Sequence, residues 1–117
     1  MMEISFEEFK KLDIRVGKIV QAERIAESEK LVKLLVDLGL PADEAGEGEP
    51  RQIVAGIGLA YPNEADLVGK EIVVLCNLEP KTFLGHTSYG MLLAADSGGV
   101  PVVLQPGQDV PPGSIIK

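Results

Sequence analysis

Short apolar segments, rich in Val, Ile and Leu, recur along this chain roughly every ten to twenty residues. The segments that predict strands are residues 13–25, 30–38, 51–57, 70–77, 90–95 and 100–104. The connections between them are rich in Gly and Pro and leave room only for short helices. Parallel strands need a long crossover, so this spacing predicts an all-β fold, a small closed barrel rather than an alternating βα sheet.

The length allows a hydrophobic core without disulfides or structural metal. A folded chain of 117 residues buries about two thirds of the surface that it exposes when unfolded. Hydrophobic residues make up 45% and charged residues 25% of the chain, which is typical of a folded domain and not of disorder. We therefore expect a single domain over residues 1–117. Its one cysteine, Cys76, excludes an internal disulfide.

Local patterns predict the turns and short helices. Residues 5–12 predict a helix in which Ser5 and Glu8 form a capping box. Residues 62–69 predict a turn followed by one helical turn, and residues 96–99 predict a hairpin. In the first strand, Gly17 is the expected site of a β-bulge.

Residues 30–38 fit two patterns. Val32, Leu34 and Val36 alternate as in a strand, but the leucines of this segment also match one helix face. The short length and the Gly-Leu-Pro sequence that follows favour a strand. In that strand Lys33 lies on the face opposite the core.

Residues 85–90 (GHTSYG) hold the only histidine, His86, and suggest two kinds of catalytic motif. A phosphate-binding loop needs Lys and Ser or Thr after its second glycine, but Met91 and Leu92 follow here. A serine nucleophile needs a Gly-x-Ser-x-Gly turn and an oriented base, and this segment has neither. The favoured interpretation is a polar loop between strands.

Other reactive or ligand-binding patterns are incomplete. One cysteine and one histidine do not complete a closed zinc site, and the acidic segment at residues 39–50 lacks the order of a calcium loop. Residues 56–58 (GIG) lack the third glycine and the helix of a dinucleotide fingerprint. We therefore predict a protein that is not an enzyme, with no metal and no cofactor, in which Cys76 is a small core residue.

The chain shows no pattern for membrane insertion or secretion. Its longest apolar runs, residues 72–76 and 91–95, are far shorter than the roughly 20 residues that span a bilayer. The N-terminus has no basic region followed by an apolar stretch. We expect a cytoplasmic protein with no membrane partner.

The formal net charge of −7 argues against a polyanion as partner, but the charge is unevenly distributed. Residues 39–50 hold four acidic residues and no basic one, and predict a solvated loop. The basic residues on or beside predicted strands are Arg15, Lys18, Lys30, Lys33, Arg51 and Lys81. A local group of cations can bind phosphate, because salt confines each charge's field to about 8 Å. From charge alone, ordinary solvated strand charges remain the favoured interpretation.

Five segments in order carry a resemblance to a known family. They are residues 13–19 (DIRVGKI), 28–34 (SEKLVKL), 51–57 (RQIVAGI), 69–81 with its GK and NLEPK ends, and 85–95 (GHTSYGMLLAA). Together they closely resemble the structure-independent tRNA-binding domain family. Its members include the C-terminal domain or β subunit of methionyl-tRNA synthetase and stand-alone tRNA-binding proteins.

This resemblance implies a five-stranded oligonucleotide-binding (OB-fold) barrel whose N-terminal helix and C-terminal extension pack across a homodimer. It also implies a non-catalytic domain that binds tRNA by shape and assists aminoacylation, with the catalytic part of methionyl-tRNA synthetase as a further partner and no DNA expected. The alternative is a dimeric secretion-related protein chaperone of the same fold. Residues 88–91 (SYGM) resemble the tRNA-binding branch more closely.

The residues that the resemblance places on the RNA face are Arg15, Lys30, Lys33, Arg51, Asn77, Lys81, Ser88 and Met91. The basic side chains would meet phosphates, Asn77 and Ser88 would hydrogen-bond the backbone or 2′-hydroxyls, and Met91 would contact a base or ribose. For Ser88 and Met91 the alternative is turn capping and strand-end packing. Two features depart from the family: the long acidic segment at residues 39–50, and Phe83, on which a base could stack or which could simply pack.

Overall fold

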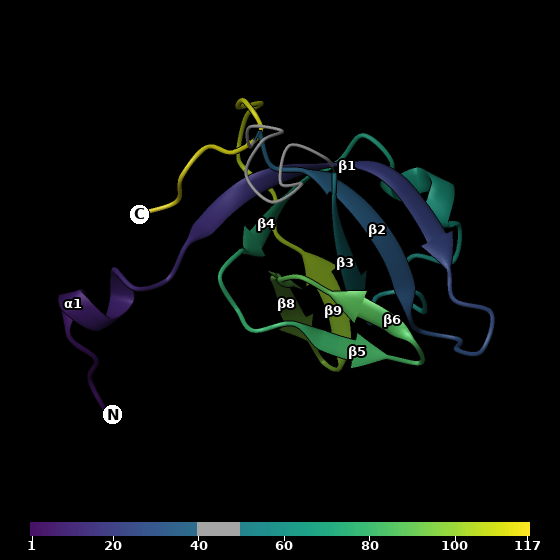
Figure 1. Ribbon diagram of the computed structural model, residues 1–117, viewed down its shortest axis with the longest axis horizontal. Helices are drawn as coiled ribbons and strands as arrows, with labels where there is room; N and C mark the ends of the chain where they lie inside the picture. The colour runs from purple at the N-terminus through teal and green to yellow at the C-terminus, as the bar shows by residue number, and fades with distance from the viewer. Residues whose placement is uncertain (40–49) are drawn as a thin grey trace.

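Five antiparallel strands form the main sheet of the protein, in the order β3-β2-β1-β4-β7 (Figure 1). The computed structural model describes residues 1–39 and 50–117. The elements are α1 (Phe6–Phe9), β1 (Ile14–Arg24), β2 (Val32–Asp37), β3 (Arg51–Ala55), the 3-10 helix η1 (Glu64–Leu67), β4 (Glu71–Leu75), β5 (Lys81–Phe83), β6 (His86–Ser88), β7 (Met91–Leu92), β8 (Ala94–Ser97) and β9 (Val100–Val103). The all-β prediction is confirmed.

The barrel is nearly closed by hydrogen bonds between β3 and residues 87–89, at the end of β6. The Tyr89 N–H donates to the Gln52 carbonyl at 2.9 Å. The Gln52 side-chain amide donates to the Thr87 carbonyl at 2.8 Å, and the Val54 N–H donates to Ser88 Oγ at 2.9 Å. These bonds satisfy the outer edge of β3 and give an OB-like barrel, as predicted.

The interpretation of residues 85–90 as a polar loop is wrong. His86–Ser88 forms strand β6, which pairs with β5 so that Phe83 lies opposite His86. The two residues between them, Leu84 and Gly85, have φ of 48° and 83°, which defines a tight type I′ turn. Leucine is rare at such a turn, so the hairpin has no usual sequence signal.

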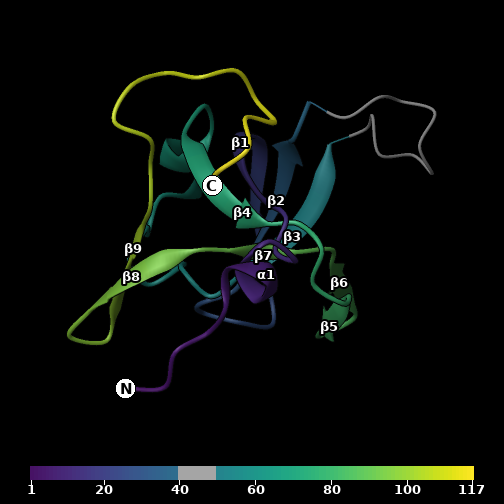
Figure 2. The same ribbon diagram turned by 90° about the vertical axis from the view of Figure 1, so that its left-hand side faces the viewer.

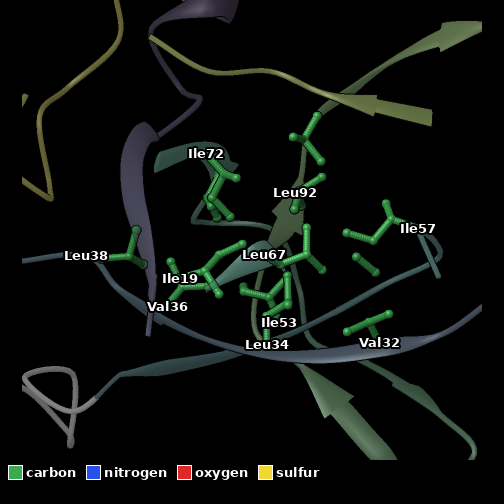
Figure 3. Packing of buried hydrophobic residues seen from close by; sticks show 13 residues of the cluster. Ile19, Val32, Leu34, Val36, Leu38, Ile53, Ile57, Leu67, Ile72 and Leu92 are labelled. Atoms are coloured by element: carbon green, nitrogen blue, oxygen red, sulfur yellow. The ribbon is translucent and has the colours of Figure 1, made fainter. Parts of the chain in front are cut away.

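The core lies inside the barrel and is lined by alternating residues of its strands (Figure 3). Val32, Leu34 and Val36 of β2 are fully buried, which confirms the strand interpretation of this segment. Leu67 of η1 is also fully buried and packs in the same cluster. Each such side chain contributes about 1.5–3 kcal/mol by leaving water.

The β-bulge in β1 lies at Val20 and not at Gly17, so that prediction is wrong. The pairing of β1 with β2 shifts between Ile19 and Gln21, which leaves Val20 as the extra, exposed residue. The shift keeps Ile19 in the core. Gly17 is required for a different reason, because a Cβ there would overlap with the side chain of Val36.

The C-terminal tail of the chain returns to the start of β1. Ile115 forms a bridge with Arg15, and the Ile116 N–H donates to the Ile14 carbonyl at 2.8 Å. The short helix α1 has the predicted capping box, buries none of its residues and projects away from the barrel (Figures 1 and 2). No helix in residues 1–39 and 50–117 is long and apolar enough to cross a membrane.

Candidate nucleic-acid interface

Two of the predicted lysines are connected through strand pairings and one hydrogen bond. Lys33 of β2 lies opposite Val54 of β3, whose N–H donates to Ser88 of β6. Ser88 in turn lies opposite Lys81 of β5. We call these four residues the cross-strand row.

Lys33 is paired with a carboxylate on the neighbouring strand. Its Nζ lies 3.0 Å from Glu23 Oε1, and the two residues face each other in the β1–β2 pairing. The Lys33 side chain is 25% exposed and that of Glu23 is 58% exposed. Because Glu23 is largely exposed, the pair contributes only about 0–1 kcal/mol, so Lys33 can exchange Glu23 for another anion at little cost.

Lys81 lies at the base of the β5–β6 hairpin. Its ammonium group is 5.1 Å from the centre of the Phe83 ring, a distance typical of a cation–π contact. The described residues hold no ion pair to Lys81, and its side chain is exposed. The hairpin lies beside β3 (Figures 1 and 2) and therefore extends the surface of β2 and β3.

Ser88 is 3% exposed and its hydroxyl is fully used within the barrel. Ser88 Oγ accepts from the Val54 N–H and donates to the Gly90 carbonyl at 2.8 Å. The Ser88 hydroxyl thus accepts the hydrogen bond that a backbone carbonyl of a neighbouring strand would otherwise accept from the Val54 N–H. This is the structural role that the sequence left as the alternative, and the contact of Ser88 with RNA stays an untested prediction.

Lys30 is exposed in the turn between β1 and β2, at one end of β2. Its N–H donates to Ser28 Oγ at 3.2 Å, and its carbonyl accepts from the Gly58 N–H at 2.7 Å. A Cβ on Gly58 would lie 2.9 Å from the Lys30 carbonyl oxygen, so the close approach requires glycine. The turn is thereby held against the segment that follows β3.

Arg24 was not singled out from the sequence, yet it organises the loops at this end of the barrel. Its guanidinium donates to the carbonyls of Gly58, Tyr61 and Pro62 at 2.7–3.0 Å. It also donates to the Glu29 carbonyl at 3.1 Å, in the same turn as Lys30. The acceptors are up to 38 residues away in sequence, so no local pattern indicates this role.

Arg15 and Arg51 lie in a second group, around Cys76. The Arg51 guanidinium donates to the Cys76 carbonyl at 2.9 Å, and Arg15 Nε pairs with Asp13 Oδ1 at 2.8 Å. Burial raises the pKa of the Cys76 thiol and Asp13 adds to this, while the two arginines act in the opposite direction. Cys76 is therefore a protonated, half-buried thiol at neutral pH.

Asn77 and Met91 belong to this second group. The Asn77 side chain accepts from the Asp13 N–H at 2.9 Å and donates to the Lys11 carbonyl at 2.6 Å, which fixes the link between α1 and β1. Met91 is exposed and lies opposite Leu75 at the end of β4. The eight predicted residues thus do not form one group, since Lys30 lies apart from both in the turn between β1 and β2, and contact of any of them with RNA stays a prediction.

The arrangement defines a class of protein. OB-fold barrels bind oligonucleotides on their second and third strands and on the loops between strands 1 and 2 and strands 4 and 5. Here these parts are β2, β3, the turn with Lys30, and residues 76–90 with the β5–β6 hairpin. Among residues 1–39 and 50–117 no three His, Cys, Asp or Glu side chains are grouped as for a metal ion. The fold is that of an OB-like barrel, with Lys30, Lys33 and Lys81 on the strands and connections that such barrels use for binding.

Comparison with known proteins places the chain in a family. The tRNA binding domain family model matches residues 14–115. The chain therefore belongs to the tRNA-binding domain family, as the sequence resemblance indicated. It is 47% identical over 96% of its length to the methionine–tRNA ligase of Archaeoglobus fulgidus, and 49% identical over 97% to that of Methanothrix thermoacetophila. The chain spans only 16% of the length of each ligase.

Solved structures agree with this fold. A MetRS-related protein from Pyrococcus horikoshii superposes with a TM-score of 0.86 at 35% identity, and each chain is fully covered. The chaperone CsaA of Bacillus anthracis superposes with a TM-score of 0.82 at 32% identity, covering 99% of this chain and 100% of the other.

Proposed function

We propose that this chain is a non-catalytic domain that binds tRNA by its shape and assists methionyl-tRNA synthetase. The observation that supports the proposal is the cross-strand row, which links Lys33 and Lys81 through Val54 and Ser88 in a chain from the tRNA-binding domain family. Lysines on a strand surface contact phosphates, which guide position and not base identity. Folded RNA is read largely through such backbone and shape contacts.

In this mechanism Lys33 exchanges Glu23 for a phosphate, while Lys81 and Lys30 contact neighbouring parts of the backbone. Each phosphate that a lysine neutralises releases counterions, so binding weakens as salt rises. The net charge of −7 opposes general attraction to polyanions. We therefore expect local, salt-sensitive binding of tRNA and no binding of DNA.

The domain would assist aminoacylation by raising the effective concentration of tRNA near the catalytic part. A tRNA-binding domain that is joined to a catalytic part, or associates with it as a β subunit, makes the second contact of the tRNA intramolecular. The chain's similarity to 16% of the length of methionine–tRNA ligases supports this arrangement. Aminoacylation by the catalytic part should therefore show a lower KM for tRNA when this chain is present than when it is absent, with kcat unchanged.

We also propose a homodimer. Phe6 of α1 is exposed, as are Ile4 and Leu12 beside the helix, and Ile115 in the tail near the start of β1. A second copy that covers these side chains would remove them from water, and two-fold dimers are the commonest assembly. Sedimentation should give about 25 kDa, twice the chain mass of 12.5 kDa, and Phe6→Asp should shift it to the monomer. A concentration-independent monomer would contradict the dimer.

Binding to mixed tRNA at several salt concentrations tests the main proposal. The slope of log affinity against log salt should fall by about one for Lys33→Ala and for Lys81→Ala. Glu23→Gln should raise affinity, since it frees Lys33 and removes a repulsive charge. Lys70→Ala is the matched control, because Lys70 lies in an open hollow lined by Glu71 and Asp109. The proposal fails if wild-type protein does not bind tRNA at low salt, or if Lys70→Ala weakens binding as much as Lys33→Ala.

The second candidate is a protein chaperone. Its support is the similarity to two CsaA structures, from Bacillus anthracis and Picrophilus torridus, at TM-scores of 0.82. A chaperone binds unfolded polypeptide through apolar surface, so its binding should survive high salt. The same titration with an unfolded polypeptide in place of tRNA separates the two functions.

A further inference from the structure

Leu84, at the tip of the β5–β6 hairpin, has an unfavourable backbone conformation. Its φ of 48° lies in the left-handed region, and it is the only non-glycine residue among those described with a positive φ. The tip of a type I′ turn prefers Asn, Asp or Gly, because a branched or bulky side chain crowds the backbone there. The hairpin itself would form more readily without this leucine.

Packing of the Leu84 side chain within the described fold does not offset the cost of this backbone conformation. It is 56% exposed and is not part of the buried hydrophobic cluster. An exposed apolar group on a strained turn points to a contact outside the chain, since strain of this kind gathers at binding sites.

The hairpin holds its tip firmly. The hydroxyls of Thr82 and Thr87 are 3.0 Å apart across the two strands, and the Gln52 side chain donates to the Thr87 carbonyl. Ser88, the last residue of β6, is bonded to β3. Because the tip is already ordered, little conformational entropy is lost when a partner contacts it.

The strand that leads to the tip also carries a cation. Lys81 contacts Phe83 with its ammonium 5.1 Å from the ring centre, so one face of this ring is already covered. Leu84, the next residue, offers the exposed apolar surface of the hairpin. A cation next to an apolar tip matches a nucleotide, which offers a phosphate and the flat face of a base.

We propose that Leu84 packs against an unstacked base of the bound tRNA while Lys81 meets a nearby phosphate. This inference rests on the proposed tRNA binding and names a contact within it. Exposed loops of a folded tRNA provide such bases, whereas a regular RNA duplex keeps its bases stacked. Leu84 would thereby help the domain to prefer folded tRNA over duplex RNA.

The test uses Leu84→Asn and Leu84→Gly in the full chain. Both variants relieve the turn, so the melting temperature should stay the same or rise by about 2–6 °C. Affinity for tRNA should fall by about 5- to 30-fold, as expected for loss of one base contact. The salt slope should stay unchanged because no phosphate contact is lost. Affinity for a regular RNA duplex should not change.

Val68→Asn is the matched control. Val68 is also an exposed apolar residue, but it borders the open hollow that Lys70, Glu71 and Asp109 line and is not part of the β5–β6 hairpin. It should leave tRNA affinity unchanged. Leu84 variants that bind tRNA as the wild type does, or that lose affinity for duplex equally, would overturn the proposal.

The outcomes separate this inference from the proposed function. If wild-type protein binds tRNA and the Leu84 variants bind equally well, only the base contact is overturned. If wild-type protein binds unfolded polypeptide and not tRNA, and the Leu84 variants weaken that binding, the occupant of the tip is a protein and both proposals are overturned.

Discussion

The β5–β6 and β8–β9 hairpins have the same turn but differ in the residues that form it. Gly98 and Gly99 at the tip of β8–β9 have φ of 60° and 90°, close to the 48° and 83° of Leu84 and Gly85 in β5–β6. Glycine adopts these angles at no steric cost, whereas leucine does not. The comparison shows that the turn alone does not explain the residue at the first tip.

The two hairpins also differ in how they join the barrel. The β5–β6 hairpin is bonded to β3 through Gln52 and Ser88 and continues the surface that carries Lys33. All four residues of β8 are exposed, and the β8–β9 hairpin projects from the other side in Figure 2. Its attachment includes the bond from the Val103 N–H to the Tyr61 hydroxyl at 3.1 Å. The strained tip therefore lies on the hairpin that is tied to the candidate interface.

The largest effect should come from breaking the attachment of the β5–β6 hairpin. Ser88→Ala removes the acceptor of the buried Val54 N–H, which should lower the free energy of unfolding by about 2 kcal/mol. Urea unfolding measures this loss. Ser97→Ala, in the exposed strand β8, is the control and should change stability by less than about 0.5 kcal/mol. An equal loss in both variants would contradict the role of Ser88 in closing the barrel.

Transferring the strained tip to the other hairpin sharpens the comparison. Gly98→Leu places a leucine at a φ of 60° and should lower the free energy of unfolding by about 1–2 kcal/mol. Because this hairpin is not part of the cross-strand row, tRNA affinity should stay the same. A rise in tRNA affinity would show that an exposed leucine strengthens tRNA binding on either hairpin, and so would contradict a specific role for the β5–β6 tip.

Loosening the β8–β9 hairpin should have a smaller effect. Tyr61→Phe removes the hydroxyl that accepts from the Val103 N–H and should cost about 1 kcal/mol. Amide hydrogen exchange should show faster exchange at Val103, while exchange at Val54 stays slow. Loss of protection at both amides would mean that the two hairpins are not independent.

The smallest effect concerns the turn of the glycine hairpin. Asp96 Oδ1 accepts from the Gly99 N–H at 2.7 Å in an exposed setting. Asp96→Ala should therefore cost only about 0.5 kcal/mol, seen as a small shift of the urea midpoint. Asp96→Asn keeps the acceptor and should behave as the wild type. A loss as large as that of Ser88→Ala would contradict the ranking.

Much of the barrel could be predicted because its signals are local. The alternation of Val32, Leu34 and Val36 identifies β2 and places Lys33 outside the core. Which residues of β1 face the core after Ile19 could not be predicted, since the bulge at Val20 depends on pairing with β2. The β5–β6 hairpin was missed because its strands are three residues long and its turn begins with leucine.

For the site, residue types were easier to predict than residue roles. Lysines on strand surfaces can be read from the alternation of β2. The hydrogen bonds of Ser88 and Asn77, however, reach partners 34 and 64 residues away. Such partners depend on the completed fold, so polar side chains that stabilise the barrel resemble RNA contacts in the sequence.

The pair of Lys33 and Glu23 has a consequence for selectivity. Glu23 acts as a competitor built into the protein, already occupying the cation that a phosphate would use. A free nucleotide or phosphate ion must displace this carboxylate with a single contact. Under the proposed function a tRNA would make several contacts at once, so its displacement of Glu23 would be one step within a larger binding event. Because the pair is worth only about 0–1 kcal/mol, in the proposed binding mode Glu23 would weaken the binding of a single small anion a few-fold and would affect a long polyanion less.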